Sequence, residues 1–128
     1  MNNSMSPSLG VRFQVGANGE PQFIDQGGHR HYKVVFEIEN LPEGVYAATF
    51  ELDPTYFDPV RTLRPDENGR IRLEVNAYGD YDVNVRLRTR EGEVRVRGNL
   101  YRELQRSCQE MKLGGPAIEE ALADIAAN

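Results

Sequence analysis

The chain has 128 residues, a formal net charge of -5 and one cysteine. This length fits a single domain whose core needs no disulfide or structural metal, and one cysteine excludes an internal disulfide. The acidic balance excludes a typical duplex nucleic-acid binder, which needs clustered cations to neutralise phosphates.

The N-terminal sequence MNNSMSPS has neither the charged start nor the apolar run of a signal peptide. We expect residues 1–8 to be disordered. No later stretch approaches the length of a membrane span. We therefore expect a cytoplasmic protein that binds neither membranes nor nucleic acid.

Between residues 9 and 100 hydrophobic and polar residues alternate with the period of two that is typical of β-strands with one solvent-facing side. The alternation occurs in six runs, at residues 11–15, 34–38, 46–52, 71–75, 83–87 and 94–96. Turn pairs such as Asn18-Gly19 and Asn68-Gly69 separate the runs. No helical pattern lies between them, so we expect a small antiparallel sandwich and exclude a parallel α/β sheet.

After Gly98 the spacing of hydrophobic residues changes to three and four, which predicts two short helices within residues 101–128. A break at Gly114-Gly115-Pro116 separates them. Their apolar sides are expected to pack on the sandwich or on a second copy of the chain. The second possibility predicts a homo-oligomeric partner interface at Leu104, Met111, Ile118, Leu122 and Ile125.

Candidates for catalysis or metal binding are few. On a strand, His29 and His31 would point to one face as a weak metal pair, or they would lie in a solvated turn. Cys108 would be a reactive thiol or, more simply, a small buried hydrophobic residue. No nucleophile, phosphate-loop or zinc motif is present. We expect no enzyme activity, no catalytic residue, no metal and no cofactor.

Five arginines lie on the two sides of the expected Glu91-Gly92 hairpin, so one sheet face could carry five cations. They are Arg86, Arg88, Arg90, Arg95 and Arg97. They form either a basic stripe for an acidic partner or cross-strand ion pairs with acidic residues of neighbouring strands. The candidate acidic residues are Glu37, Glu51, Glu74 and Asp82.

Two loops are rich in aromatic residues. Tyr56 and Phe57 follow one strand in a loop constrained by prolines, and Tyr78 and Tyr81 flank Gly79 at the start of another strand. Rings from two loops at one end of a sandwich can enclose a flat or cationic group. They can equally plug the end of the core.

Together these loops resemble the YEATS domain family, in particular its prokaryotic branch. The first family motif is a strand that ends in a V-x-[FY]-x-L-H-x-[ST]-[FY]-x-x-P loop, and the second is a G-[WY]-x-x-F turn. The first is matched by Phe50, Leu52, Thr55, Tyr56, Pro59 and Arg61, and the second by Tyr78, Gly79 and Tyr81. The likeness extends from about His31 to Leu100.

This resemblance implies an immunoglobulin-like antiparallel β-sandwich and no enzymatic activity. The change of period adds one or two short C-terminal helices to this fold. In eukaryotic members the two loops form an aromatic slot for acylated lysine. Carried over to this chain, the slot is formed by Thr55, Tyr56, Tyr78 and Tyr81, and the wider set of ligand-binding candidates adds Asp53, Phe57 and Gly79.

The chain departs from this pattern at two positions. Asp53 stands where those members have His, and Ala77 stands where they have Gly. With Asp58 and Asp80 also in the loops, carboxylates would rim the slot and favour a positively charged ligand over a neutral acyl group. The hypothesis is that any ligand is cationic, or that the slot is vestigial.

The expected function is therefore a non-enzymatic module that recognises a protein or peptide partner, acting as an adaptor in prokaryotic signalling or defence. The alternative is a structural subunit that has no ligand slot and oligomerises through its C-terminal helices.

Overall fold

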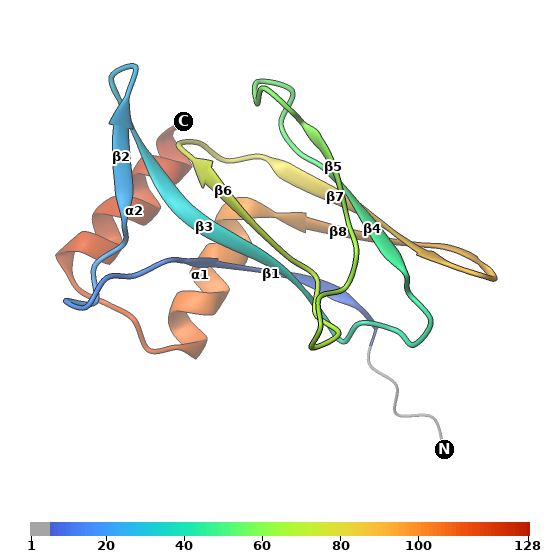
Figure 1. Cartoon of the computed structure of the whole chain (residues 1–128). Coiled ribbons are helices and arrows are strands. Elements are labelled where there is room, and N and C mark those ends of the chain that lie inside the picture. The colour runs from blue at the N-terminus through green and yellow to red at the C-terminus, as the bar shows by residue number, and fades with distance from the viewer. Residues whose placement is uncertain (1–5) are drawn as a thin grey trace.

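The computed structural model describes residues 6–128, which form eight strands and two C-terminal helices (Figure 1). The elements are β1 (Ser8–Phe13), β2 (Phe23–Gln26), β3 (His29–Glu39), β4 (Ala47–Glu51), β5 (Val60–Leu63), β6 (Arg72–Ala77), β7 (Asp82–Thr89), β8 (Gly92–Asn99), α1 (Leu100–Glu110) and α2 (Pro116–Ala127). Most of the segment 1–8 expected to be disordered lies outside the described residues. Ser8 already belongs to β1.

The strands form two antiparallel sheets. In the first sheet, the long strand β3 pairs with β1 and β2 along one edge and with β6 along the other. The second sheet has the order β5-β4-β7-β8. The predicted antiparallel sandwich is confirmed.

Alternating hydrophobic residues point inward from both sheets and form one core with the helices. Phe36 of the first sheet and Phe50 of the second are fully buried, with ring centroids 6.4 Å apart. Tyr46 was predicted to share the buried face of β4, but it precedes the strand and is 54% exposed. The alternation therefore overestimated this run by one residue at its start.

Two strands were missed from the sequence. The four residues of β2, FIDQ, are all exposed, so they show no alternation. The four residues of β5, VRTL, lie at a sheet edge and are never fully buried. Both strands are defined by pairing with a longer neighbour, and such pairing leaves little trace in the hydrophobic pattern.

Both helices pack on the sandwich. The side chain of Asn99 caps α1 by accepting from the backbone N–H of Arg102, and α2 begins at Pro116, whose fixed φ suits a first helical position. The five residues predicted for a partner interface differ in how far they are buried. Leu104, Ile118 and Ile125 are buried in the core of the same chain, Leu122 is half-buried, and only Met111 is exposed.

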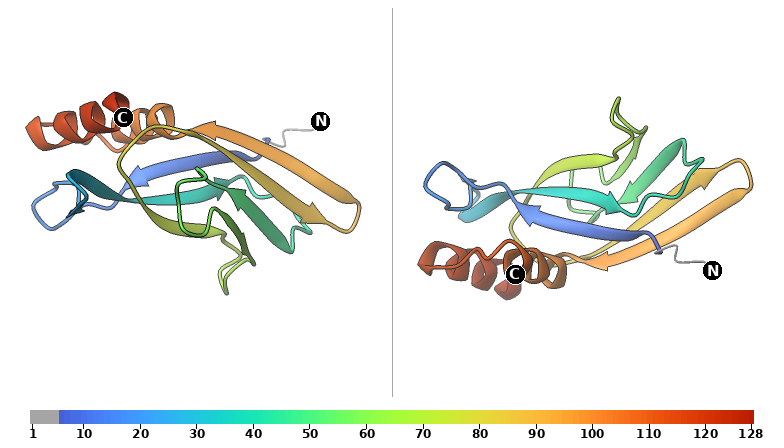
Figure 2. Two further views of the ribbon diagram at one scale, coloured as in Figure 1. Left: turned by 90° about the horizontal axis from the view of Figure 1, so that it is seen from above. Right: turned by 90° about the horizontal axis from the view of Figure 1, so that it is seen from below.

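The two sides of the sandwich differ in how the sheets meet. On one side β1 contacts β8, and α1 covers both; we call this the closed seam. On the other side β5 and β6 are the terminal strands of their sheets, and we call this the open seam. Figure 2 shows the helices beside β8 and β1, away from β5 and β6. No helix of the described residues is long and apolar enough to span a membrane.

Candidate functional site

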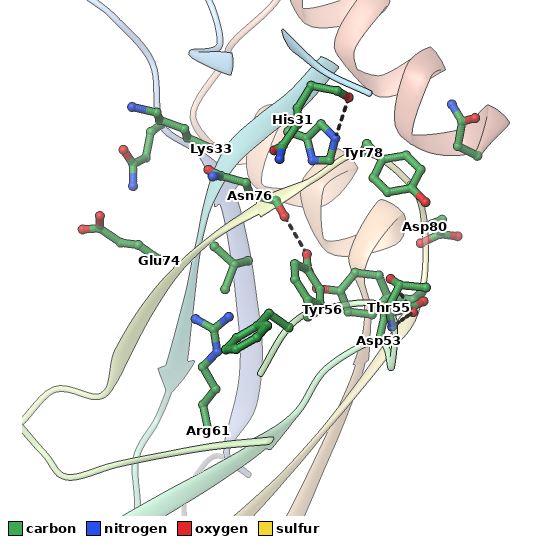
Figure 3. A pocket seen from close by; sticks show the side chains of 17 residues that line it. His31, Lys33, Asp53, Thr55, Tyr56, Arg61, Glu74, Asn76, Tyr78 and Asp80 are labelled. Atoms are coloured by element: carbon green, nitrogen blue, oxygen red, sulfur yellow. Dashed lines mark hydrogen bonds between the residues drawn. The ribbon is translucent and has the colours of Figure 1, made fainter. Parts of the chain in front are cut away.

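A cavity of about 780 Å³ lies at the end of the sandwich where the open seam begins (Figure 3). The loop after β4, the turn between β6 and β7, and β6 itself line it. All seven predicted ligand-binding residues are among its lining residues: Asp53, Thr55, Tyr56, Phe57, Tyr78, Gly79 and Tyr81. The structure thus brings the two aromatic loops together, and their role in binding stays a prediction.

Local hydrogen bonds hold the first loop in place. The backbone N–H of Leu52 donates to the carbonyl of Pro59 at 2.7 Å, which closes the loop at its base. At its tip the Asp53 carboxylate accepts from the backbone N–H of Thr55 at 2.9 Å and from its hydroxyl at 2.8 Å. This Asx-type turn presents Thr55 at the cavity wall.

Two tyrosine hydroxyls form a chain that crosses from one loop to β6. Tyr81 donates to the hydroxyl of Tyr56 at 2.9 Å, and Tyr56 donates to the backbone carbonyl of Asn76 at 2.7 Å. The rings meet edge to face, with centroids 5.7 Å apart. Burial raises the pKa of both hydroxyls, so both are protonated at neutral pH.

The burial of the two tyrosines shows whether the aromatic loops plug the end of the core or enclose a cavity. Tyr56 and Tyr81 are half-buried and pack against the core, yet both also line the cavity. Phe57 projects fully into solvent at the rim. The aromatic loops therefore close the core with part of each ring and leave a hollow in front of it.

The hydroxyl protons of Thr55, Tyr56 and Tyr81 are committed to acceptors. A carbonyl and a carboxylate cannot donate, so Tyr56 must donate to Asn76, Thr55 must donate to Asp53, and Tyr81 must then donate to Tyr56. The oxygens of these three hydroxyls still have lone pairs that can accept hydrogen bonds from a ligand. They are acceptors for a ligand that brings its own N–H groups.

The acidic rim differs from the expected one. Asp53 and Asp80 line the cavity, whereas Asp58 does not. Asp80 also caps α1, because its carboxylate accepts from the backbone N–H of Tyr101 at 3.0 Å. Glu74 adds a carboxylate that the sequence did not point to, and Lys33 and Arg61 add cations. The cavity is thus lined by both acidic and basic side chains.

The histidine pair contacts the second aromatic loop. His29 and His31 lie on one side of β3, as their spacing predicted, and the ring of Tyr78 lies 4.7 Å from His29 and 4.9 Å from His31, measured between centroids. Among residues 6–128 no three His, Cys, Asp or Glu side chains gather as a metal site. Both histidine rings pack against the ring of Tyr78.

Cys108 takes the simpler of its two predicted roles. It is 4% exposed within the core, and burial raises the pKa of its thiol. A thiol in this setting is a packing residue, since reactive cysteines need a lowered pKa and access.

The arginines of β7 and β8 are partly neutralised by their neighbours. Arg86 lies 3.4 Å from a carboxylate oxygen of Glu51, and Arg97 lies 3.6 Å from one of Asp82. Glu37 belongs to the other sheet and pairs with Arg12 and Arg70, each at 3.2 Å. The cross-strand alternative thus holds for Arg86 and Arg97.

Several cavity residues were missed from the sequence. They come from β1, β2, β3, β6 and the end of α2, or from the residues next to these elements. They are Gln14, Gln26, His31, Lys33, Glu74, Val75, Asn76 and Asn128. Arg61 was noted only as a motif match. No local pattern marks these residues, because strand pairing and helix docking bring them to the cavity.

Comparison with known proteins places this geometry in context. The prokaryotic YEATS domain family matches residues 32–100, more than half of the chain. The crystal structure of the yeast AF-9 homolog protein Yaf9 is 17% identical, with a TM-score of 0.50, over 73% of this chain and 65% of that one. This chain thus spans less than two thirds of that structure.

A structure of the Yaf9 YEATS domain recognizing an H3K122suc peptide is 16% identical, with a TM-score of 0.49, over 75% of this chain and 71% of that one. No curated protein sequence matches the chain. At these identities the structural likeness concerns the fold, and it confirms the expected immunoglobulin-like sandwich.

Proposed function

Because the chain belongs to the prokaryotic YEATS domain family, we propose that it is a non-enzymatic module that recognises a peptide and takes a lysine side chain into the cavity between its two aromatic loops. The observation that carries this proposal is the convergence of Thr55, Tyr56 and Tyr81 on one cavity. These are motif positions of the family, and they come from two separate loops.

The hydrogen bonds of three cavity hydroxyls favour a cationic ligand over an acylated one. An acyl-lysine amide needs a donor for its carbonyl oxygen, but the hydroxyl protons of Thr55, Tyr56 and Tyr81 are already used. An ammonium group brings three donors and no acceptor, and aromatic rings attract it further. We propose that an unmodified or methylated lysine is the preferred side chain.

The test is an NMR titration of isotope-labelled protein with one histone-tail-like peptide that carries its central lysine unmodified, acetylated or crotonylated. We expect shifts at the cavity residues Thr55, Tyr56, Tyr78 and Tyr81, with the unmodified peptide binding most tightly. A tighter acetylated peptide would overturn the charge preference alone. No shifts with any of the three would overturn the proposed function.

A matched pair of variants separates the cavity from general effects. Tyr56→Phe removes the hydroxyl that joins the two halves of the site, and Tyr46→Phe removes a hydroxyl from a 54% exposed ring outside the cavity. We expect Tyr56→Phe to weaken binding about threefold or more, the usual scale for one net hydrogen bond. Tyr46→Phe should leave binding unchanged.

The cellular role belongs to the same proposal. We propose that the module acts through its partner, as an adaptor in the cytoplasm. Homo-oligomer formation stays a separate prediction. The burial of Leu104, Ile118 and Ile125 leaves Met111 and part of Leu122 to support it, and light scattering of the full chain tests it.

A further inference from the structure

The outer edge of β6 carries backbone groups that no other strand uses. In an antiparallel ladder, residues alternate between pairs that exchange both backbone hydrogen bonds and pairs that exchange none. Ile38 and Ile71 are the next pair after the last paired residues of β3 and β6, and the backbone N–H of Ile38 donates to the carbonyl of Ile71. Every second residue from Ile71 onward therefore bonds to β3, namely Leu73, Val75 and Ala77. The N–H and C=O groups of Arg72, Glu74 and Asn76 therefore point away from β3.

Among these outward backbone groups, only one accepts a hydrogen bond from the described residues, and its donor belongs to the aromatic slot. Within residues 6–128 the backbone hydrogen bonds outside regular elements include none to Arg72 or Glu74. The outward carbonyl of Asn76 accepts from the Tyr56 hydroxyl. The slot and the strand edge are therefore contiguous, since one atom of the edge is part of the hydrogen-bond chain of the slot.

The geometry points to β6 as the docking edge for the partner's main chain. We propose that the peptide binds as an extended strand added to β6, paired with the outward groups of Glu74 and Arg72, while its lysine side chain enters the slot. This inference rests on the proposed function and names how the rest of the peptide is held. Glu74 lies two residues from Asn76, about 7 Å along the strand, which is within reach of one long side chain.

The cavity itself follows this edge. Glu74, Val75 and Asn76 all line it, and Figure 3 shows β6 running past Tyr56 toward Tyr78. On the other strand of the open seam, the register leaves Val60 and Thr62 with outward backbone groups, and neither lines the cavity. The edge of β6 is thus the one that a peptide anchored in the slot would meet.

The contact between the β6 edge and the cavity argues for a lysine-bearing peptide rather than a second copy of the chain as the added strand. Sheet edges are natural templates for strand addition. Two copies of β6 pairing antiparallel about Glu74 would place the two Glu74 carboxylates opposite each other, whereas pairing about Leu73 would place Glu74 opposite Arg72. Neither register by itself would place a side chain of the second copy in the slot, whereas a peptide lysine joins the edge to the slot. A lysine-bearing peptide meets the same carboxylate with a cation.

Backbone methylation of the peptide tests the inference without changing the protein. In an added strand only every second peptide N–H faces β6. With the unmodified-lysine histone-tail-like peptide, methylating its backbone amides one at a time should weaken binding by about three- to tenfold at alternate positions, the scale of one hydrogen bond. A loss without this alternation, or no loss, would overturn the inference.

A pair of protein variants tests the same edge. Glu74→Pro and Glu74→Ala both remove the carboxylate, but only the proline removes the outward N–H, which β3 does not use. We expect Glu74→Pro to bind the peptide at least threefold more weakly than Glu74→Ala, with both variants showing the dispersed NMR spectrum of the folded protein. Equal affinities of the two folded variants would overturn the inference.

The readouts separate this inference from the proposed function. Peptide-induced shifts at Tyr56 and Tyr81 without protection of the Glu74 amide from hydrogen exchange would overturn edge docking and leave the slot proposal standing. Absence of shifts at both places would overturn both. Peptide-independent, concentration-dependent protection of Glu74 would instead assign the edge to a second copy of the chain.

Discussion

The closed and open seams of this sandwich use their side chains in opposite ways. At the closed seam β1 approaches β8 closely, and fully buried residues such as Leu9, Leu100 and Leu104 fill the space between the sheets and α1. At the open seam Phe57 is fully exposed, and polar groups of Thr55, Tyr81 and β6 surround a cavity. The packing that stabilises the domain and the cavity that we propose for recognition thus lie on opposite sides of one small domain.

The largest expected effect is at the closed seam. Leu104→Ala removes a fully buried side chain of α1 from the core, and we expect the free energy of unfolding to fall by about 2 to 5 kcal/mol. Denaturant unfolding measures it. The counterpart at the open seam is Phe57→Ala, which we expect to change stability by less than about 0.5 kcal/mol. Similar losses in both variants would contradict the division between the seams.

A second prediction concerns the hydrogen bond that joins α2 to β3. The Tyr32 hydroxyl donates to Asp124 of α2, and burial, with this carboxylate, raises the pKa of Tyr32 from 10.0 to about 12. A group whose pKa is raised on folding stabilises the protein fully below its unfolded pKa. That stability is lost as the pH rises from about 10 to about 12.

Unfolding experiments between pH 8 and 12 measure this loss. Tyr56 and Tyr81 also have raised pKa values, so the quantity of interest is the difference between the wild type and Tyr32→Phe. We expect the wild type to lose more stability over this window than the variant. Parallel curves would show that the Tyr32 hydroxyl does not titrate as the contact with Asp124 requires.

The close approach of β8 and β1 gives a third prediction. A Cβ atom at Gly98 would lie 3.0 Å from a side-chain carbon of Leu9, closer than ordinary contact. Gly98→Ala should therefore cost about 1 kcal/mol of stability, because Leu9 must shift within a packed core. At Gly114 nothing lies within 4 Å of such an atom, so Gly114→Ala is the control. Thermal unfolding of both variants sharpens the contrast between packed and open positions.

The smallest expected effect lies in the connection between the two strands of the open seam. The Asp66 carboxylate accepts from the backbone N–H groups of Arg70 and Asn68, which lowers its pKa below 3.8. The stability this adds is present above the ordinary pKa and is lost as the pH falls through the lowered one. NMR titration should find the midpoint of Asp66 below 3.8, and Asp66→Asn should be nearly as stable as the wild type at neutral pH. A midpoint at or above 3.8 would contradict the turn geometry.

Much of the architecture was determined by the sequence itself. Alternation in β3, β6 and β7 is set by which side chains must leave water, and this depends only on the local period. The change of period after Gly98 likewise marked both helices. The two aromatic loops carried a family resemblance, which is confirmed, and the seven residues predicted from them line one cavity.

What the tertiary structure decided is which of these residues meet. The contact of Tyr56 with Asn76, the packing of His29 and His31 against Tyr78, and the division of the interface residues into buried and exposed all join segments that are distant in sequence. Such contacts arise from sheet register and helix docking, which minimise the exposed area of the whole chain. A local pattern records that a side chain is hydrophobic or polar, but only the assembled fold determines its neighbour.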